Sequence, residues 1–282
     1  MRITNILISI LAAMLISGCA NNLRFQDSPP ATQNESINYS INSTIKSESE
    51  IFSQARTITP TSPIYYYQNY GGGGVIVGAL FGPIGVLTNM AMINSNTDND
   101  IAALSGKISL DPIEITKQAI TQNEKFVESK SPANDFLISP YIIIVKGDNE
   151  SLHFSSVVDV ASGAWKGRYS YHLASRLPLS KLTSGLSPAE ASKIKADIEH
   201  GFQQALALFE SDIAGTLQPM KEISFYSEPV SPRIKMIVPA KLIKDENNEV
   251  VVLGPGGADQ FSFILSSGYH KLRKSDADIS AR

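Results

Sequence analysis

Few side chains in this chain of 282 residues are suited to covalent or acid–base chemistry. Cys19 is the only cysteine, and the four histidines are His153, His172, His200 and His270. A cysteine thiolate is a nucleophile, and a neutral imidazole accepts protons or binds metals. The sequence contains no Gly-x-Ser-x-Gly, His-Glu-x-x-His or Gly-x-x-x-x-Gly-Lys-Ser/Thr motif. We therefore expect a protein that is not an enzyme and that needs no cofactor.

Cys19 lies at the end of an N-terminal segment with the order of a secretory signal. Arg2 gives a positive start, residues 6–16 form an apolar run, and the small pair Ser17-Gly18 follows. The run is too short to cross a bilayer, which takes about 20 residues. This order predicts that residues 1–18 are removed on export.

The four residues Ile16-Ser17-Gly18-Cys19 resemble the lipobox of bacterial lipoproteins. The resemblance implies cleavage before Cys19 and acylation of its thiol and new amino group, with fatty acids such as palmitate. Several acyl chains anchor a protein stably in a membrane. Ala20, where inner-membrane retention would place aspartate, favours the outer membrane by resemblance to enterobacterial sorting. The expected location is the outer membrane, with the folded domain facing the periplasm.

Two stretches follow before the expected domain. Residues 19–62 are rich in Ser, Asn, Thr, Gln and Pro without a sustained apolar period, which is typical of a flexible tether. Residues 63–97 carry no Lys, Arg, Asp or Glu and join a tyrosine cluster to a Gly-rich apolar run. The net charge of −3 gives no reason to expect nucleic acid as a partner.

The Gly-rich run places Gly74, Gly78 and Gly82 four residues apart, on one face of any helix. Such a small-residue stripe lets another helix approach closely, and over these residues the chain resembles glycine-zipper envelope lipoproteins. Three interpretations stay open: membrane contact or self-association, a buried helical hairpin bent at Pro83, or a Gly-rich loop. The tyrosines before it would suit a membrane-interface belt.

Residues 98–272 are expected to form an α+β domain with an antiparallel sheet and at least two amphipathic helices. A helix is predicted over 111–129, where Asp111-Pro112 forms a start signal, and another over 187–217, where Ser187-Pro188-Ala189-Glu190 forms a capping box. The predicted strands are 136–145, 152–160, 165–173, 223–227, 233–244, 250–253 and 261–265. The first is a central apolar strand, and residues 273–282 are expected to be a polar tail.

The strands 152–160 and 165–173 should form a hairpin. Pairing Val160 with Trp165 also places Asp159 opposite Lys166, an opposite-charge pair. The same register places His153 opposite His172 on the polar face, but two histidines alone are too few for a metal site, so we expect no metal.

On the apolar face of this hairpin, Trp165, Tyr169 and Tyr171 lie in a row. They are candidates for a ligand face that would take a lipid or a glycan, although aromatic residues of a strand more often belong to the core. The expected function is assembly or docking in the envelope, with a protein partner or a second copy. The alternatives are a lipid- or glycan-binding module and a hydrolase without a recognisable motif.

Overall fold

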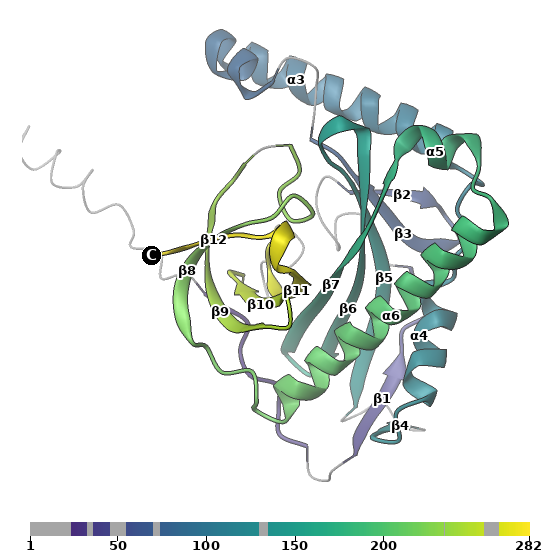
Figure 1. Ribbon diagram of the computed structural model, residues 1–282, viewed down its shortest axis with the longest axis vertical. Coiled ribbons are helices and arrows are strands. Elements are labelled where there is room, and N and C mark those ends of the chain that lie inside the picture. The colour runs from purple at the N-terminus through teal and green to yellow at the C-terminus, as the bar shows by residue number, and fades with distance from the viewer. Residues whose placement is uncertain are drawn as a thin grey trace, which may run out of the picture.

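The computed structural model describes residues 24–32, 36–45, 55–69, 74–129, 135–233, 235–256 and 265–282, of which 74–88 are described as backbone only. Over these residues the chain has the predicted α+β fold, with one mixed, mostly antiparallel sheet and four α-helices. Figure 1 shows a twisted sheet whose C-terminal strands curl to one side, with a long helix lying across the rest. The strand order is β12-β8-β9-β10-β11-β7-β6-β5-β1-β4, with β2 and β3 beside this path.

Three long antiparallel strands form the centre of the sheet: β5 (Phe136–Lys146), β6 (Ser151–Ser162) and β7 (Trp165–Pro178). A short 3-10 turn, Asp148–Glu150, joins the first two. The apolar run of β5 is buried, which confirms it as the predicted central strand.

The β6–β7 hairpin has the predicted faces but a different register. Asp159 lies opposite Arg168 rather than Lys166, because Ser162 pairs with Trp165 across a two-residue turn. Gly163 in that turn has φ +57°, a conformation that two-residue hairpin turns need and glycine adopts readily. The shift is two residues, so each side chain keeps its face of the sheet and changes its partner.

Parts of the expected 19–62 tether form strands of the sheet. β1 (Ile37–Ile41) lies parallel to β5, and β2 (Arg56–Thr59) pairs antiparallel with β3 (Ser62–Tyr67). β3 in turn lies parallel to β5. The tether interpretation was wrong here, because isolated apolar residues of this stretch, such as Ile37 and Ile58, are buried against distant parts of the chain.

The tyrosine cluster and the Gly-rich run also differ from expectation. Tyr65, Tyr66 and Tyr67 of β3 are buried in the sheet, so they do not form an interface belt. α3 (Gly74–Leu104) is one continuous helix through Pro83, which excludes the hairpin and the loop. Proline removes one backbone donor from this helix without ending it.

The next helix, α4 (Pro112–Thr121), begins as predicted. Asp111 Oδ1 accepts the backbone N–H groups of Ile113 and Glu114. It ends earlier than expected, because the chain turns at Asn123 into the short strand β4 (Phe126–Glu128), which pairs with β1.

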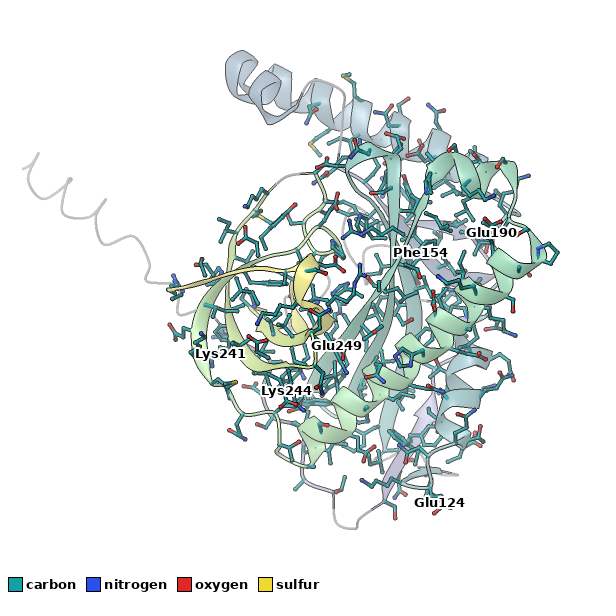
Figure 2. The ribbon with its side chains drawn as sticks, in the orientation of Figure 1. Glu124, Phe154, Glu190, Lys241, Lys244 and Glu249 are labelled. Carbon is teal, nitrogen blue, oxygen red and sulfur yellow. The ribbon has the colours of Figure 1, made fainter. Side chains whose placement is uncertain are left out.

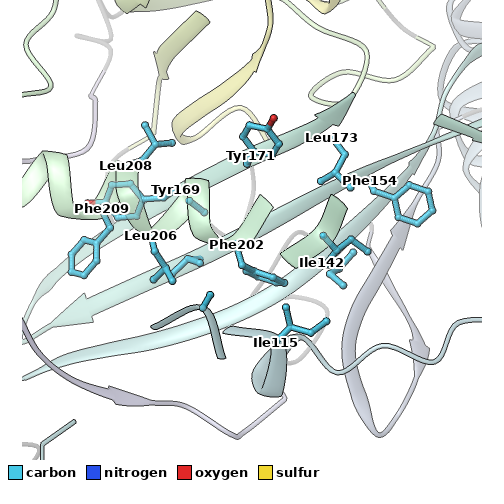
Figure 3. Close-up of a cluster of buried hydrophobic side chains, with 14 of the residues drawn as sticks. Ile115, Ile142, Phe154, Tyr169, Tyr171, Leu173, Phe202, Leu206, Leu208 and Phe209 are labelled. Atoms are coloured by element: carbon cyan, nitrogen blue, oxygen red, sulfur yellow. The ribbon is translucent and has the colours of Figure 1, made fainter. Parts of the chain in front are cut away.

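The main core lies between the central strands and a helical layer. After the short α5 (Leu179–Ser184), the capping box of Ser187 and Glu190 starts α6 (Pro188–Ile213), which ends four residues before the predicted position 217. Figure 3 shows the apolar face of α6 meeting the odd-numbered side chains of β7 and the even-numbered ones of β5 and β6. Ile198, Phe202 and Phe209 are completely buried there.

The C-terminal strands extend the same sheet. They are β8 (Lys221–Tyr226), β9 (Val238–Glu246), β10 (Glu249–Gly254), β11 (Gly268–Arg273) and β12 (Asp278–Ala281). β11 lies parallel to β7, and after a 3-10 turn, Lys274–Asp276, β12 pairs with β8. Half of the expected polar tail at 273–282 is therefore strand, and position 265 of the predicted strand 261–265 is a turn.

Candidate functional site

The C-terminal half of α3 is bonded to the domain along one side of the helix. The Gln68 amide donates to the carbonyl of Ile93 at 2.9 Å and to Thr97 Oγ1 at 3.0 Å. One turn further on, the Tyr66 hydroxyl donates to Asp100 Oδ2 at 2.6 Å. Burial, and then this hydrogen bond, raises the pKa of Tyr66 far above its ordinary value, so its hydroxyl stays a donor.

An ion pair strengthens the same contact. Lys146 Nζ lies 2.9 Å from Asp100 Oδ2, with 10% and 12% of the two side chains exposed. Leu104, at the end of the helix, is completely buried. These bonds join α3 to β3 and β5, and α3 also contacts β2 and α5.

The predicted glycine row belongs to the N-terminal half of the same helix. Gly74, Gly78 and Gly82 follow one another along one side of α3. Gly82 lies eighteen residues before Asp100, which is five complete turns of the helix. The row of glycines therefore ends on the same side of the helix as Asp100, the side that contacts the domain. Between the two parts, Met90 and Met92 are exposed by 49% and 43%. Within the residues that the structure describes, no helix combines the length and apolarity needed to cross a membrane.

The candidate ligand face of the hairpin is covered. Tyr169 is completely buried under α6, and its ring stacks on that of Tyr269 with centroids 5.7 Å apart. Tyr171 is buried, and its hydroxyl donates to Glu249 at 3.2 Å. Trp165 packs its ring edge-on against Phe136. Tyr169 and Tyr171 belong to the core, and Trp165 is a partly buried residue that packs against it.

Sequence reasoning missed a buried carboxylate at the end of α6. Asp212 accepts hydrogen bonds from the hydroxyls of Tyr169 (2.7 Å) and Tyr269 (3.2 Å) and from the amide of Gln26 (3.1 Å). Burial raises its pKa above the ordinary aspartate value, and the three donors oppose that rise. The signal was weak, because position 212 falls among apolar positions near the end of a helix.

The opposite face of β6 and β7 is also buried, although many of its residues are polar. On β5 the same face carries the buried residues Tyr141, Ile143 and Val145. Arg168 is 1% exposed and forms two hydrogen bonds with Asp159, from Nε at 2.8 Å and from Nη2 at 3.1 Å. The Tyr141 hydroxyl donates to the same carboxylate at 3.0 Å. The charge on Arg168 is therefore compensated within the sheet.

Three histidines lie on this face, in a different arrangement from the predicted one. His153 lies opposite Arg176, and its Nε2 is 3.1 Å from Glu228. His172 Nδ1 is 2.7 Å from Ser155 Oγ, and His172 Nε2 is 3.0 Å from Nδ1 of His270. His200, by contrast, is exposed on α6.

Burial keeps the His172–His270 pair neutral. It lowers the pKa of His270 to about 4 and, together with the neighbouring imidazoles, lowers the pKa of His172 well below its ordinary value. Ser155 is 2% exposed, so its hydroxyl is not accessible to a substrate in this structure. In the described part of the chain, no cluster of three or more His, Cys, Asp or Glu is placed to hold a metal ion.

An open cleft of about 440 Å³ lies between α6 and strands β9 to β11. Leu208, Ile243 and Val251 contribute apolar wall, and Lys244 and Glu249 lie at its border (Figure 2). The charges there are matched within the chain, since Glu249 pairs with Lys271 at 2.9 Å. The cleft therefore combines apolar walls with a charged border.

The proposed lipidation residue, Cys19, lies outside the described residues. No protein-family model matches this chain, and neither a curated protein nor a solved structure shows significant similarity to it.

Proposed function

We propose that this chain is a lipid-anchored protein of the bacterial outer membrane that acts in assembly rather than catalysis, by pairing with a second copy through α3. The lipobox-like residues ending at Cys19 support the anchor. The glycine row supports the pairing, and it is the observation on which the proposal depends.

The way in which α3 is bonded to the domain supports the proposed pairing. Bonds from Gln68, Tyr66 and Lys146 fix its C-terminal half to the sheet, so the backbone of the glycine-bearing half extends from a rigid base. A preorganised helix loses less conformational freedom on binding than a flexible segment does. Figure 1 shows α3 running along one end of the sheet and past it.

A second copy is the simplest partner for such a row. Two helices that both carry glycine at every fourth position can approach closely along their whole contact, and the apolar residues beside the glycines then contact each other. Identical surfaces also satisfy the symmetry of a two-fold dimer, in which each patch meets itself.

Point substitutions in α3 test the proposal by chemical crosslinking in intact cells. Gly78→Leu places a bulky side chain in the row and should abolish a discrete dimer band. Ala79→Leu adds the same side chain about 100° around the helix and should retain the band. A dimer band that survives Gly78→Leu, in a protein that remains folded and acylated, would overturn the pairing.

A further inference from the structure

The first described residues, 24–27, form an N-terminal strap across the ends of β7 and β10. The Gly256 N–H donates to the carbonyl of Arg24 at 2.8 Å, and Phe25 pairs with Pro255 as an isolated β-bridge. The Trp165 indole N–H donates to the carbonyl of Asp27 at 2.9 Å. The strap backbone thus has contacts at positions 24, 25 and 27.

Gln26 makes the strap part of the core. Its side chain is 7% exposed, and its Oε1 accepts the backbone N–H of Arg168 at 2.8 Å. Its Nε2 donates to Tyr169 and Asp212, each at 3.1 Å. Without Gln26, the buried Arg168 N–H would lose this acceptor. Gln26 therefore bonds the strap to both β7 and α6.

Covalent geometry then limits the distance from the strap to the lipid. Arg24 lies five positions after Cys19, and an extended chain spans at most about 3.6 Å per residue. The acylated residue can therefore lie no more than about 18 Å from the strap. The longer tether expected over residues 19–62 would have allowed the domain to move several times further.

We propose that the strap fastens the domain directly to the membrane surface, with Arg24 no more than about 18 Å from the acylated residue. This inference rests on the proposed acylation of Cys19. The partner surface is the bilayer itself, because the chain between lipid and strap is too short to place another folded layer between them. Arg24 and Lys166 are exposed at this end, where a cation is favoured next to anionic headgroups.

Two labelling positions test the proposal on the full, acylated chain in vesicles of phosphatidylethanolamine and phosphatidylglycerol. Lys166→Cys places a fluorophore beside the strap, and Ser184→Cys places it on α5, beyond the other end of β7. That strand of fourteen residues spans about 40 Å. Because Cys19 is the only native cysteine and is acylated, each introduced thiol takes the label alone.

The experiment measures energy transfer from the protein-bound fluorophore to labelled headgroups. It compares the native chain with a variant that carries a Gly/Ser insertion of about 20 residues between Leu23 and Arg24. Such an insertion adds roughly 25 Å of reach and leaves every strap contact in place. Transfer from position 166 should be strong in the native chain and fall roughly twofold or more with the insertion. Transfer from position 166 that does not change would overturn the proposal, provided that the protein carries its fatty acid.

Fatty-acid labelling separates this failure from failure of the proposed function. If the native chain takes up labelled fatty acid and the Cys19→Ser variant does not, the native chain is acylated at Cys19. Unchanged energy transfer would then count against the strap alone. A native chain that takes up no fatty acid would overturn the anchor, and the inference with it.

Discussion

The two faces of β6 and β7 are both buried, but they are built from different kinds of residues. Under α6, one face consists of apolar side chains such as Phe154, Tyr169 and Leu173. On the other, Asp159, Arg168 and the histidines alternate with them along the same strands. The first face is stabilised by the removal of apolar area from water, which depends little on direction. The second is stable only while each polar group keeps its partner.

This difference means that equal changes should have unequal effects on the two faces. Removing a methylene under α6 should cost free energy in proportion to the volume lost. Removing one polar partner on the opposite face should cost the desolvation penalty of the group left behind, and replacing both partners should recover much of it. The predictions below test this contrast.

The largest effect is expected from Asp159→Ala. It leaves the Arg168 guanidinium buried without its counter-charge, and the free energy of unfolding should fall by about 3–5 kcal/mol. The double variant Asp159→Leu/Arg168→Met should be markedly more stable than Asp159→Ala. Urea denaturation measures both, and a double variant no more stable than the single one would contradict the contrast.

Acid should destabilise the polar face next. Below pH 6.5 the unfolded chain protonates its histidines, whereas His270 stays neutral in the folded chain until its pKa of about 4. Stability is therefore lost as the pH falls from 6.5 to 4, by on the order of 3 kcal/mol from His270. His172, whose pKa is also depressed, adds to the loss in the same direction.

Unfolding free energies across this pH range test the assignment. The slope should be smaller in His270→Gln than in the native chain. Equal slopes in the native chain and His270→Gln would place the acid sensitivity elsewhere.

A smaller loss in the free energy of unfolding is expected from changes at Gln26 of the strap. Gln26→Ala removes the acceptor of the Arg168 N–H and one donor to Asp212, and should lower the free energy of unfolding by about 1–3 kcal/mol. Gln26→Glu retains the acceptor for the N–H but turns a donor toward Asp212 into an acceptor, so it should not rescue stability. Thermal denaturation distinguishes the variants, and a neutral Gln26→Ala would show that the strap is not held by this side chain.

The smallest effect is expected on the apolar face. Ile198→Val removes one methylene beneath the sheet and should cost about 0.5–1.5 kcal/mol. A loss above that range would mean that this face also depends on exact partners. Urea denaturation at neutral pH provides the measurement.

The apolar face was predictable from sequence, since its residues follow helical and strand periods. The spacing from Ile194 to Phe209 and the capping box at Ser187 predicted α6 to within a few residues. The faces of the hairpin were also correct. Its register was not, because Lys166 and Arg168 lie on the same face and either can pair with Asp159, so charge did not distinguish them.

The polar face and the strap were not predictable in the same way. Alternating polar residues in a strand normally indicate solvent, and here His153 and Arg168 are buried because distant segments cover them. Gln26 and Ile37 lie in a stretch of polar composition, and their burial depends on strands that are distant in the sequence. Local pattern carries no information about such long-range pairing.

The burial of Gln26 also has a consequence for the order of folding. Its partner Asp212 lies 186 residues further along the chain. Pro255, which pairs with the adjacent Phe25, is further still. Under the proposed function, the chain is exported amino end first, so its acylated end would arrive in the envelope long before the residues that hold the strap. Contacts of such sequence separation form slowly, since they must first close a long loop. Newly exported molecules should therefore pass through a stage in which they are acylated but free to move about the anchor, before Asp212 arrives and fixes them.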